Sequence, residues 1–137
     1  MVVDASVVVS RLLPHDVHHD ASRRWLTRHV EEGGVVISPA LLLPEVAGAV
    51  ARRTGVPRLA RHAVDALLSL PALRLISVDA ALARAGARIA AQLHLRGADA
   101  LYVAAAADLR LPLVTWDVEQ HERAANLVEV LSPRDVA

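Results

Sequence analysis

The chain has no cysteine, no lysine and no phenylalanine among its 137 residues. Without cysteine there is no thiolate zinc site, no cysteine nucleophile and no disulfide framework, which is compatible with a reducing compartment. All 15 basic residues are arginine, so a phosphate-loop lysine and a Schiff-base lysine are also excluded. Three aromatic residues are too few to favour a surface that stacks on unpaired bases.

The chain also lacks a long uninterrupted apolar run. Its longest candidate, residues 35–51, is broken by Pro39, Pro44 and Glu45, which predicts a buried strand and helix and not a membrane span. An export signal is missing as well, because Asp4 falls where its apolar stretch would begin. We therefore expect a cytoplasmic protein, folded as one domain over residues 1–137, that buries about two thirds of its surface.

Turn residues and apolar periodicity divide the chain into alternating strands and helices. Asp16 and the pair Ser38-Pro39 are expected to begin helices, Pro44 to bend one, and Gly97 to interrupt a long alanine-rich helix capped by Asp79. The expected strands are 2–4, 35–37, 73–78, 113–115 and 128–131, and the expected helices are 6–13, 17–32, 38–53, 56–70, 80–96, 99–110 and 119–126. This alternation predicts an α/β fold with a mostly parallel sheet of four or five strands and helices on both faces.

Four acidic residues each interrupt or end an apolar run: Asp4, Glu45, Asp99 and Asp117. Asp4 and Asp117 are expected at the carboxyl ends of strands, where open parallel sheets bind ligands. Asp99 is expected in the first turn of a helix, which favours its ionised form. Glu45 is expected inside an apolar helix, where an acid has no capping role. Singly, the three aspartates could be strand-end or cap residues.

If the four acids converge, they predict a cation site. With neighbouring carboxylates about 5 Å apart, each like-charge pair costs roughly 3 kcal/mol at an effective dielectric of about 20. Either some of the acids take up protons or a divalent cation is bound, and ligation by oxygen alone indicates magnesium or manganese. A water activated by such an ion beside a phosphodiester is the basis of a phosphodiesterase mechanism.

Four segments carry a resemblance to a known family: VVDASV at the amino terminus, PEVAGAV, LRGADALYVAAA and LPLVTWD. In order and spacing they are similar to the PIN-domain nucleases, and most closely to the VapC-type toxins of toxin-antitoxin pairs. The resemblance covers nearly the whole chain. It implies a PIN-like three-layer sandwich and a magnesium- or manganese-dependent endoribonuclease, usually a homodimer, that is inhibited by a small antitoxin protein.

The resemblance also implies roles for individual residues. The acids that correspond to Asp4, Glu45, Asp99 and Asp117 bind the metal, and Ser6 and Thr115 help to hold the site. One feature departs from the family pattern, because an aromatic residue that many members carry shortly after the last aspartate is absent here. This departure bears on substrate contacts at that edge and not on the metal site.

Two further clusters have a structural and a functional interpretation. His15, His18 and His19 have a spacing that could suit a metal, but we expect a solvated helix start beside Pro14. The densest basic stretch lies downstream of Glu45, and its usual interpretation is a solvated face. It could also meet RNA phosphates or an antitoxin near the acidic site. The candidate contact residues are Arg52, Arg53 and Arg96.

Two other functions stay open at the level of the sequence. The same nuclease could act in RNA processing outside a toxin-antitoxin pair, and an antitoxin-like reading frame directly upstream would separate these cases. A non-catalytic module could instead use its acids to receive arginines from a partner. A phosphoaspartate enzyme is disfavoured, because Ser6 stands where a second acid would be needed and the chain has no lysine.

Overall fold

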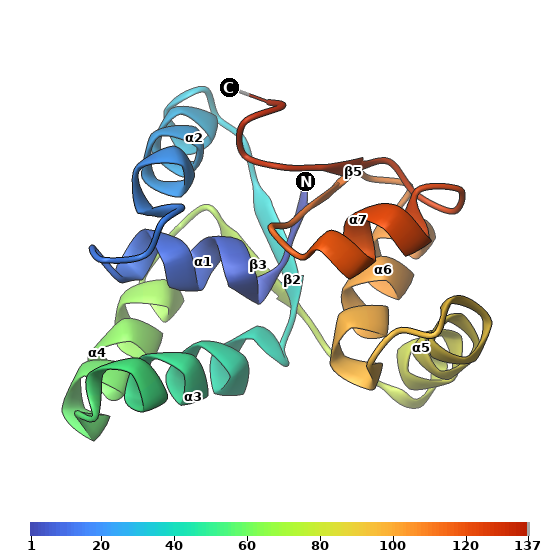
Figure 1. Ribbon diagram of the computed structural model, residues 1–137, viewed down its shortest axis with the longest axis horizontal. Coiled ribbons are helices and arrows are strands. Elements are labelled where there is room, and N and C mark those ends of the chain that lie inside the picture. The colour runs from blue at the N-terminus through green and yellow to red at the C-terminus, as the bar shows by residue number, and fades with distance from the viewer. Residues whose placement is uncertain (137) are drawn as a thin grey trace.

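Five short parallel strands form the centre of the computed structural model, which describes residues 1–136. In the sheet they lie in the order β3-β2-β1-β4-β5, with register pairs such as Val2 with Ile37 and Val2 with Leu113 (Figure 1). Their bounds are β1 Val2–Val3, β2 Val36–Pro39, β3 Leu73–Ile76, β4 Leu113–Val114 and β5 Val130–Leu131. The parallel sheet predicted from the alternating pattern is confirmed.

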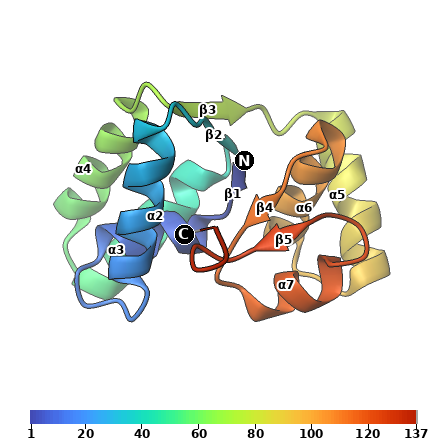
Figure 2. The same cartoon turned by 90° about the horizontal axis from the view of Figure 1, so that it is seen from above.

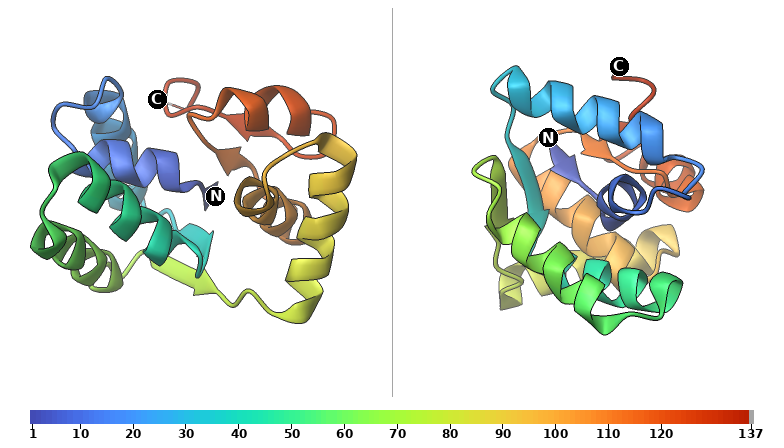
Figure 3. Two further views of the ribbon diagram at one scale, coloured as in Figure 1. Left: turned by 60° about the horizontal axis from the view of Figure 1, so that its bottom comes forward. Right: turned by 90° about the vertical axis from the view of Figure 1, so that its left-hand side faces the viewer.

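Seven helices in residues 1–136 cover the two faces of this sheet. Helices α1 to α4 gather on one side of the strands and α5 to α7 on the other (Figures 2 and 3). Right-handed crossovers explain the division, because the chain moves from β1 to β3 in one direction and returns through β4 to β5. The helices are α1 Ala5–Leu12, α2 His19–Glu31, α3 Leu42–Thr54, α4 Pro57–Leu68, α5 Ala80–Leu93, α6 Gly97–Leu109 and α7 Val118–Ala124. The three-layer α/β sandwich is thereby confirmed.

Helix α6 is the central helix of its face. It contacts β1, β2 and β4, and its buried positions include the small side chains Ala104, Ala105 and Ala106. Small residues let the helix lie close to the sheet, in which β1 and β4 are fully buried. The amino-terminal turn of α6, which carries Asp99, is therefore held firmly against the centre of the sheet.

The adjacent strands β1 and β4 form the point where the chain direction across the sheet reverses. From β1 the chain continues to β2 on one side, and from β4 it continues to β5 on the other. In open parallel sheets, ligands bind beyond the carboxyl ends of the strands at such a reversal point. Asp4 directly follows β1, and Asp117 lies three residues after β4 ends.

The expected start of the third helix was wrong. Ser38 and Pro39 end strand β2, and α3 begins only at Leu42. Proline is tolerated there because β1 is short and pairs with β2 at Ile37 alone, so the missing N–H of Pro39 interrupts no pairing with β1. Pro44 consequently lies in the first turn of α3, where no bend is needed, and Glu45 is a first-turn residue and not a mid-helix one.

Two other helix boundaries also differ from the prediction. Helix α2 begins at His19, because the Asp16 carboxylate accepts a hydrogen bond from the His18 N–H (2.8 Å) and closes a turn ahead of the helix. The long alanine-rich helix ends at Leu93, with His94 in the left-handed conformation (φ 54°), and α6 starts at Gly97. Within residues 1–136 no helix combines the length and apolarity that crossing a membrane requires.

Candidate active site

Asp4 is the most deeply buried of the four acids, with 5% of its surface exposed. It caps helix α1, and its Oδ2 accepts hydrogen bonds from the Ser6 N–H (2.9 Å) and the Thr115 hydroxyl (3.3 Å). Its Oδ1 accepts a third from the Gln120 side-chain amide (3.3 Å). Burial raises the pKa of Asp4, while the hydrogen bonds from Ser6 and Gln120 oppose the rise. Neutral donors from three segments thus fix this carboxylate and leave its charge uncompensated.

Ser6 and Thr115 connect the segments that carry Asp4 and Asp117. The Thr115 hydroxyl lies 3.4 Å from that of Ser6 and accepts the Asp117 N–H (2.9 Å). The Ser6 hydroxyl accepts the Trp116 N–H (3.0 Å). These contacts join the start of α1 to the segment between β4 and α7, so Asp4 and Asp117 are positioned by the same pair of hydroxyls.

Glu45 lies on α3, which covers the face of the sheet opposite to α6 (Figure 2). Its Oε2 accepts a hydrogen bond from the hydroxyl of Tyr102 on α6 (2.5 Å), a side chain that is fully buried. Burial raises the pKa of Glu45, the Tyr102 hydrogen bond lowers it, and the charges of Asp4 and Asp99 raise it further. Burial and the bond to Glu45 also raise the pKa of Tyr102, which therefore stays a donor.

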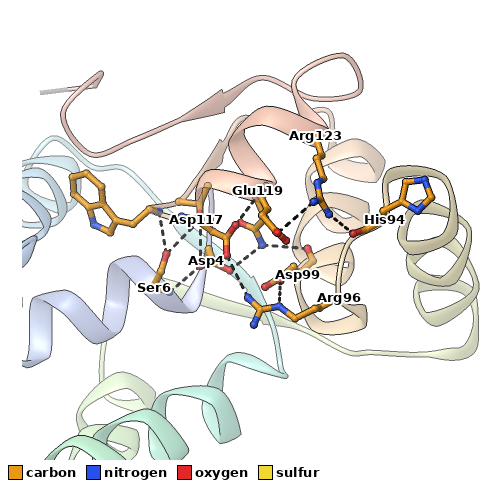
Figure 4. A network of polar contacts seen from close by, with 11 residues as sticks. Asp4, Ser6, His94, Arg96, Asp99, Asp117, Glu119 and Arg123 are labelled. Atoms are coloured by element: carbon orange, nitrogen blue, oxygen red, sulfur yellow. Dashed lines mark hydrogen bonds and ion pairs between the residues drawn. The ribbon is translucent and has the colours of Figure 1, made fainter.

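Asp99 and Asp117 are more exposed than Asp4, and both are paired with the guanidinium of Arg96. The Arg96 Nε donates to Asp99 Oδ2 (2.9 Å), and Arg96 Nη2 donates to Asp117 Oδ2 (3.5 Å; Figure 4). Burial raises the pKa of Asp99, Arg96 lowers it, and the charges of Asp117 and Asp4 raise it again. Asp117 also caps helix α7 by accepting the Gln120 N–H (2.9 Å).

Gln120 is a site residue that the sequence analysis did not identify. It is completely buried, and its amide donates both to Asp4 and to the Asp99 carbonyl oxygen (3.3 Å each). Its Oε1 is buried and has no hydrogen-bond partner among residues 1–136. Asp117 and Gln120 have the spacing of a capping box, which was the available signal, but the Gln120 side chain turns to the acids.

Trp116 anchors the segment that carries Thr115 and Asp117. Its indole N–H donates to the Ser22 hydroxyl on α2 (2.7 Å), and its ring stacks on His18 at 3.9 Å between centroids. Arg134 lies 5.5 Å from the same ring. The histidine cluster therefore has structural contacts, with His18 on Trp116 and His19 Nδ1 3.1 Å from the Ser10 carbonyl.

The remaining candidate contacts lie apart from the acids. Arg52 and Arg53 are in the last turn of α3 and Glu45 is in its first, a separation of about 10 Å along the axis at 1.5 Å per residue. Arg53 is paired with Asp16 (2.5 Å). Of the three arginines, Arg96 alone contacts the predicted site residues, so a contact of Arg52 or Arg53 with RNA or a partner stays a prediction.

Contacts and charges connect the four acids, but the acids do not converge on one point. Gln120 links Asp4 to Asp99, and Arg96 links Asp99 to Asp117. Glu45 is connected to the group by charge, because Asp4 and Asp99 add to the rise of its pKa that burial causes. In the part of the chain that the structure describes, no three acidic or histidine side chains lie close enough together to hold one ion. The candidate ligands are all carboxylate oxygens, a set whose chemistry fits a hard divalent cation.

The comparisons with known proteins agree with the fold. A family model described as the PIN domain matches residues 1–126, and the chain belongs to this family. The resemblance found in its four segments is thereby confirmed. PIN domains are nuclease domains that generally depend on divalent metals. None of the curated proteins is similar enough to match the chain.

Solved structures with the same fold include a described toxin and a toxin-antitoxin complex. VapC20 of Mycobacterium tuberculosis, described as a toxin that cleaves the sarcin-ricin loop, is 23% identical with a TM-score of 0.78, over 94% of this chain and 97% of that one. VapBC2 of Rickettsia felis, bound to a promoter DNA fragment, is 15% identical with a TM-score of 0.72, over 96% of each chain. FitAcB of Neisseria gonorrhoeae is 21% identical with a TM-score of 0.71, over 97% of each.

Proposed function

We propose that this protein is the toxin of a type II toxin-antitoxin system and acts as a magnesium- or manganese-dependent endoribonuclease. The observation that carries the proposal is Asp4, a buried carboxylate that neutral donors hold at the point where the strand order reverses. A charge held there without compensation is suited to bind a cation. Further support comes from the family and from two solved structures with the same fold, one a described toxin and the other a toxin-antitoxin complex.

In this proposal Asp4, Glu45, Asp99 and Asp117 hold the cation. When bound, the cation lowers the pKa of a coordinated water and neutralises charge on the phosphodiester. Ser6, Thr115 and Gln120 keep Asp4 in place, and the Tyr102 hydroxyl orients Glu45. Arg96 is exposed at the rim and is suited to contact RNA phosphates.

The first test is the cleavage of an RNA pool by purified protein with Mg²⁺, with Mn²⁺ or with chelator. We expect cleavage that needs the metal and falls more than about 100-fold in Asp4→Asn, beyond the 10- to 100-fold typical of residues that merely orient a ligand. Asp108→Asn is the matched control, because Asp108 is an exposed acid near the other end of α6 from Asp99. Cleavage that resists chelator, or that survives in Asp4→Asn, would contradict the proposal.

The toxin role has a separate test in cells. Expression of the chain should arrest growth, co-expression of the antitoxin encoded beside it should restore growth, and Asp4→Asn should be harmless at equal abundance. The proposed partners are that antitoxin, the RNA substrate and a second copy of the chain. Metal-dependent cleavage without growth arrest would instead favour a role in RNA processing.

A further inference from the structure

Arg96 occupies an unusual position in this site, because it is both an exposed residue and the bridge between two acids. It precedes the first residue of α6, and its guanidinium extends to both Asp99 and Asp117 (Figure 4). Its side chain is 76% exposed, whereas those of Asp99 and Asp117 are 13% and 21% exposed. The guanidinium therefore approaches the acids from solvent and can withdraw without disturbing the core.

The local charges make Arg96 the counter-ion of the site. Among the cationic side chains in residues 1–136, it alone pairs with any of the four acids. The neighbouring Arg123 is directed elsewhere, to the His94 carbonyl and to Glu119 (Figure 4). Burial raises the pKa of Asp99 and of Glu45, and the positive charge of Arg96 opposes the rise at both acids.

The bridge and a bound divalent cation would compete for the same atoms. Arg96 binds Oδ2 of Asp99 and Oδ2 of Asp117, two carboxylate oxygens that a cation held by these acids would need. A divalent ion ligated by these carboxylates would repel the guanidinium at short range. Exposed ion pairs are weak and are opposed by side-chain entropy, so this bridge is easily exchanged.

We propose that Arg96 is an exchangeable internal counter-ion, which bridges Asp99 and Asp117 in the metal-free protein and is displaced from them when a divalent cation binds. The inference rests on the proposed function, because it takes the acids as the cation site. It assigns Arg96 a positioning role: the bridge keeps two repelling carboxylates together until the ion arrives. Removing the bridge should therefore strengthen metal binding and weaken only the metal-free fold.

The test is calorimetric titration of metal-free protein with Mn²⁺, on the wild type, Arg96→Gln and Arg96→Lys. We expect the dissociation constant of Arg96→Gln to fall about threefold to tenfold, the scale of one or two exposed ion pairs. Arg96→Lys keeps the charge but lacks the planar fork that spans both acids, so we expect a smaller fall of about twofold to threefold. Arg88→Gln, which removes an exposed arginine of α5, is the matched control and should bind like the wild type.

Thermal unfolding of the same variants supplies a second readout. Arg96→Gln and Arg96→Lys should lower the unfolding midpoint of the metal-free protein and match the wild type in saturating Mn²⁺. Unchanged affinity in both variants would overturn the inference. Tighter binding in Arg96→Gln with unchanged binding in Arg96→Lys would also overturn it. That result would mean that the positive charge of residue 96 matters and that the bridge between the two acids does not.

One further variant separates the failure of this inference from that of the proposed function. Asp4→Asn should lose Mn²⁺ binding whatever Arg96 does. If the wild type binds no Mn²⁺, or if Asp4→Asn binds it as tightly, the metal site itself is wrong and both proposals fail. If Asp4→Asn loses binding while the Arg96 variants equal the wild type, only the exchange is wrong.

Discussion

The inner acid, Asp4, and the outer pair, Asp99 and Asp117, are held by different means. Asp4 is 5% exposed, and every hydrogen bond to its carboxylate comes from a neutral group: an N–H, a hydroxyl and an amide. The outer pair is held at the rim by a charged guanidinium that is itself largely in solvent. Neutral donors thus hold the carboxylate of Asp4, whereas a positive charge holds those of Asp99 and Asp117.

This difference shows how a site can be both rigid and ready to bind. Neutral donors orient a carboxylate and leave its full charge for a ligand, but they work only where the surrounding fold is firm. A guanidinium cancels the charge and must leave before a cation can take its place. The inner acid is therefore preorganised and the outer pair is exchangeable, and the predictions below test that division.

The largest expected effect separates the two parts by substitution. Asp4→Asn should reduce metal-dependent cleavage more than about 100-fold, and Asp117→Asn only about 10- to 100-fold, the range of an orienting residue. Asp117 is more exposed and water can replace its oxygen, while asparagine still caps α7. Initial rates of both variants under one metal concentration measure the difference. Equal losses would mean that the inner and outer acids do not differ in function.

The second effect concerns the donor that holds the inner acid. Gln120→Leu should weaken Mn²⁺ binding about 10- to 100-fold, because Asp4 loses a donor and α7 loses its tie to the Asp99 carbonyl. Titration calorimetry measures it, with Gln92→Leu on the exposed side of α5 as the control. Unchanged affinity in a folded Gln120→Leu would show that Ser6 and Thr115 suffice.

The smallest effect is a dependence of stability on pH. Burial raises the pKa of Asp4, Glu45 and Asp99, so between their unfolded and folded values the folded state holds more protons. The free energy of unfolding of the metal-free protein should then fall as pH rises from about 4, the ordinary pKa of these acids. For Asp4 the slope is at most about 1.4 kcal/mol per pH unit, and for the more exposed Glu45 and Asp99 it is smaller.

Urea unfolding at a series of pH values measures this slope. Saturating Mn²⁺ should remove most of it, because the ion compensates the same carboxylates. The Asp4→Asn variant should also show a shallower slope without metal. If the free energy of unfolding of the metal-free wild type does not change with pH, folding does not raise the pKa of these acids.

Much of the fold followed from the sequence, because it depends on local pattern. Apolar strands alternating with helices predicted the parallel sheet. Asp4 follows β1 and Asp99 lies in the first turn of α6, as expected. Asp117 was expected at the end of a strand, and it lies three residues after β4 as the cap of α7. The start of α3 was missed because β2 continues through Ser38 and Pro39 by pairing with β3, and this pairing is a property of the partner strand. Glu45 thus entered the site from a first turn and not from a mid-helix position.

The contacts around the acids were less predictable for a related reason. Gln120 belongs to the site only because α7 folds back over Asp4 and Asp99, and an isolated glutamine has no pattern that announces this. The bridge made by Arg96 depends on where α5 ends. The helix ends at Leu93, and the left-handed conformation of His94 sets the direction of the short segment that carries Arg96. Both depend on tertiary geometry.

The anchoring of Trp116 gives the site an intrinsic optical probe. Its indole is bonded to Ser22, stacked on His18 and placed between Thr115 and Asp117 in the chain, so its emission should respond when the outer pair is rearranged. The other tryptophan, Trp25, is buried beside His29 and can be replaced by phenylalanine to remove its background. Cation loading could then be followed in real time on an unlabelled protein, before any RNA is cut.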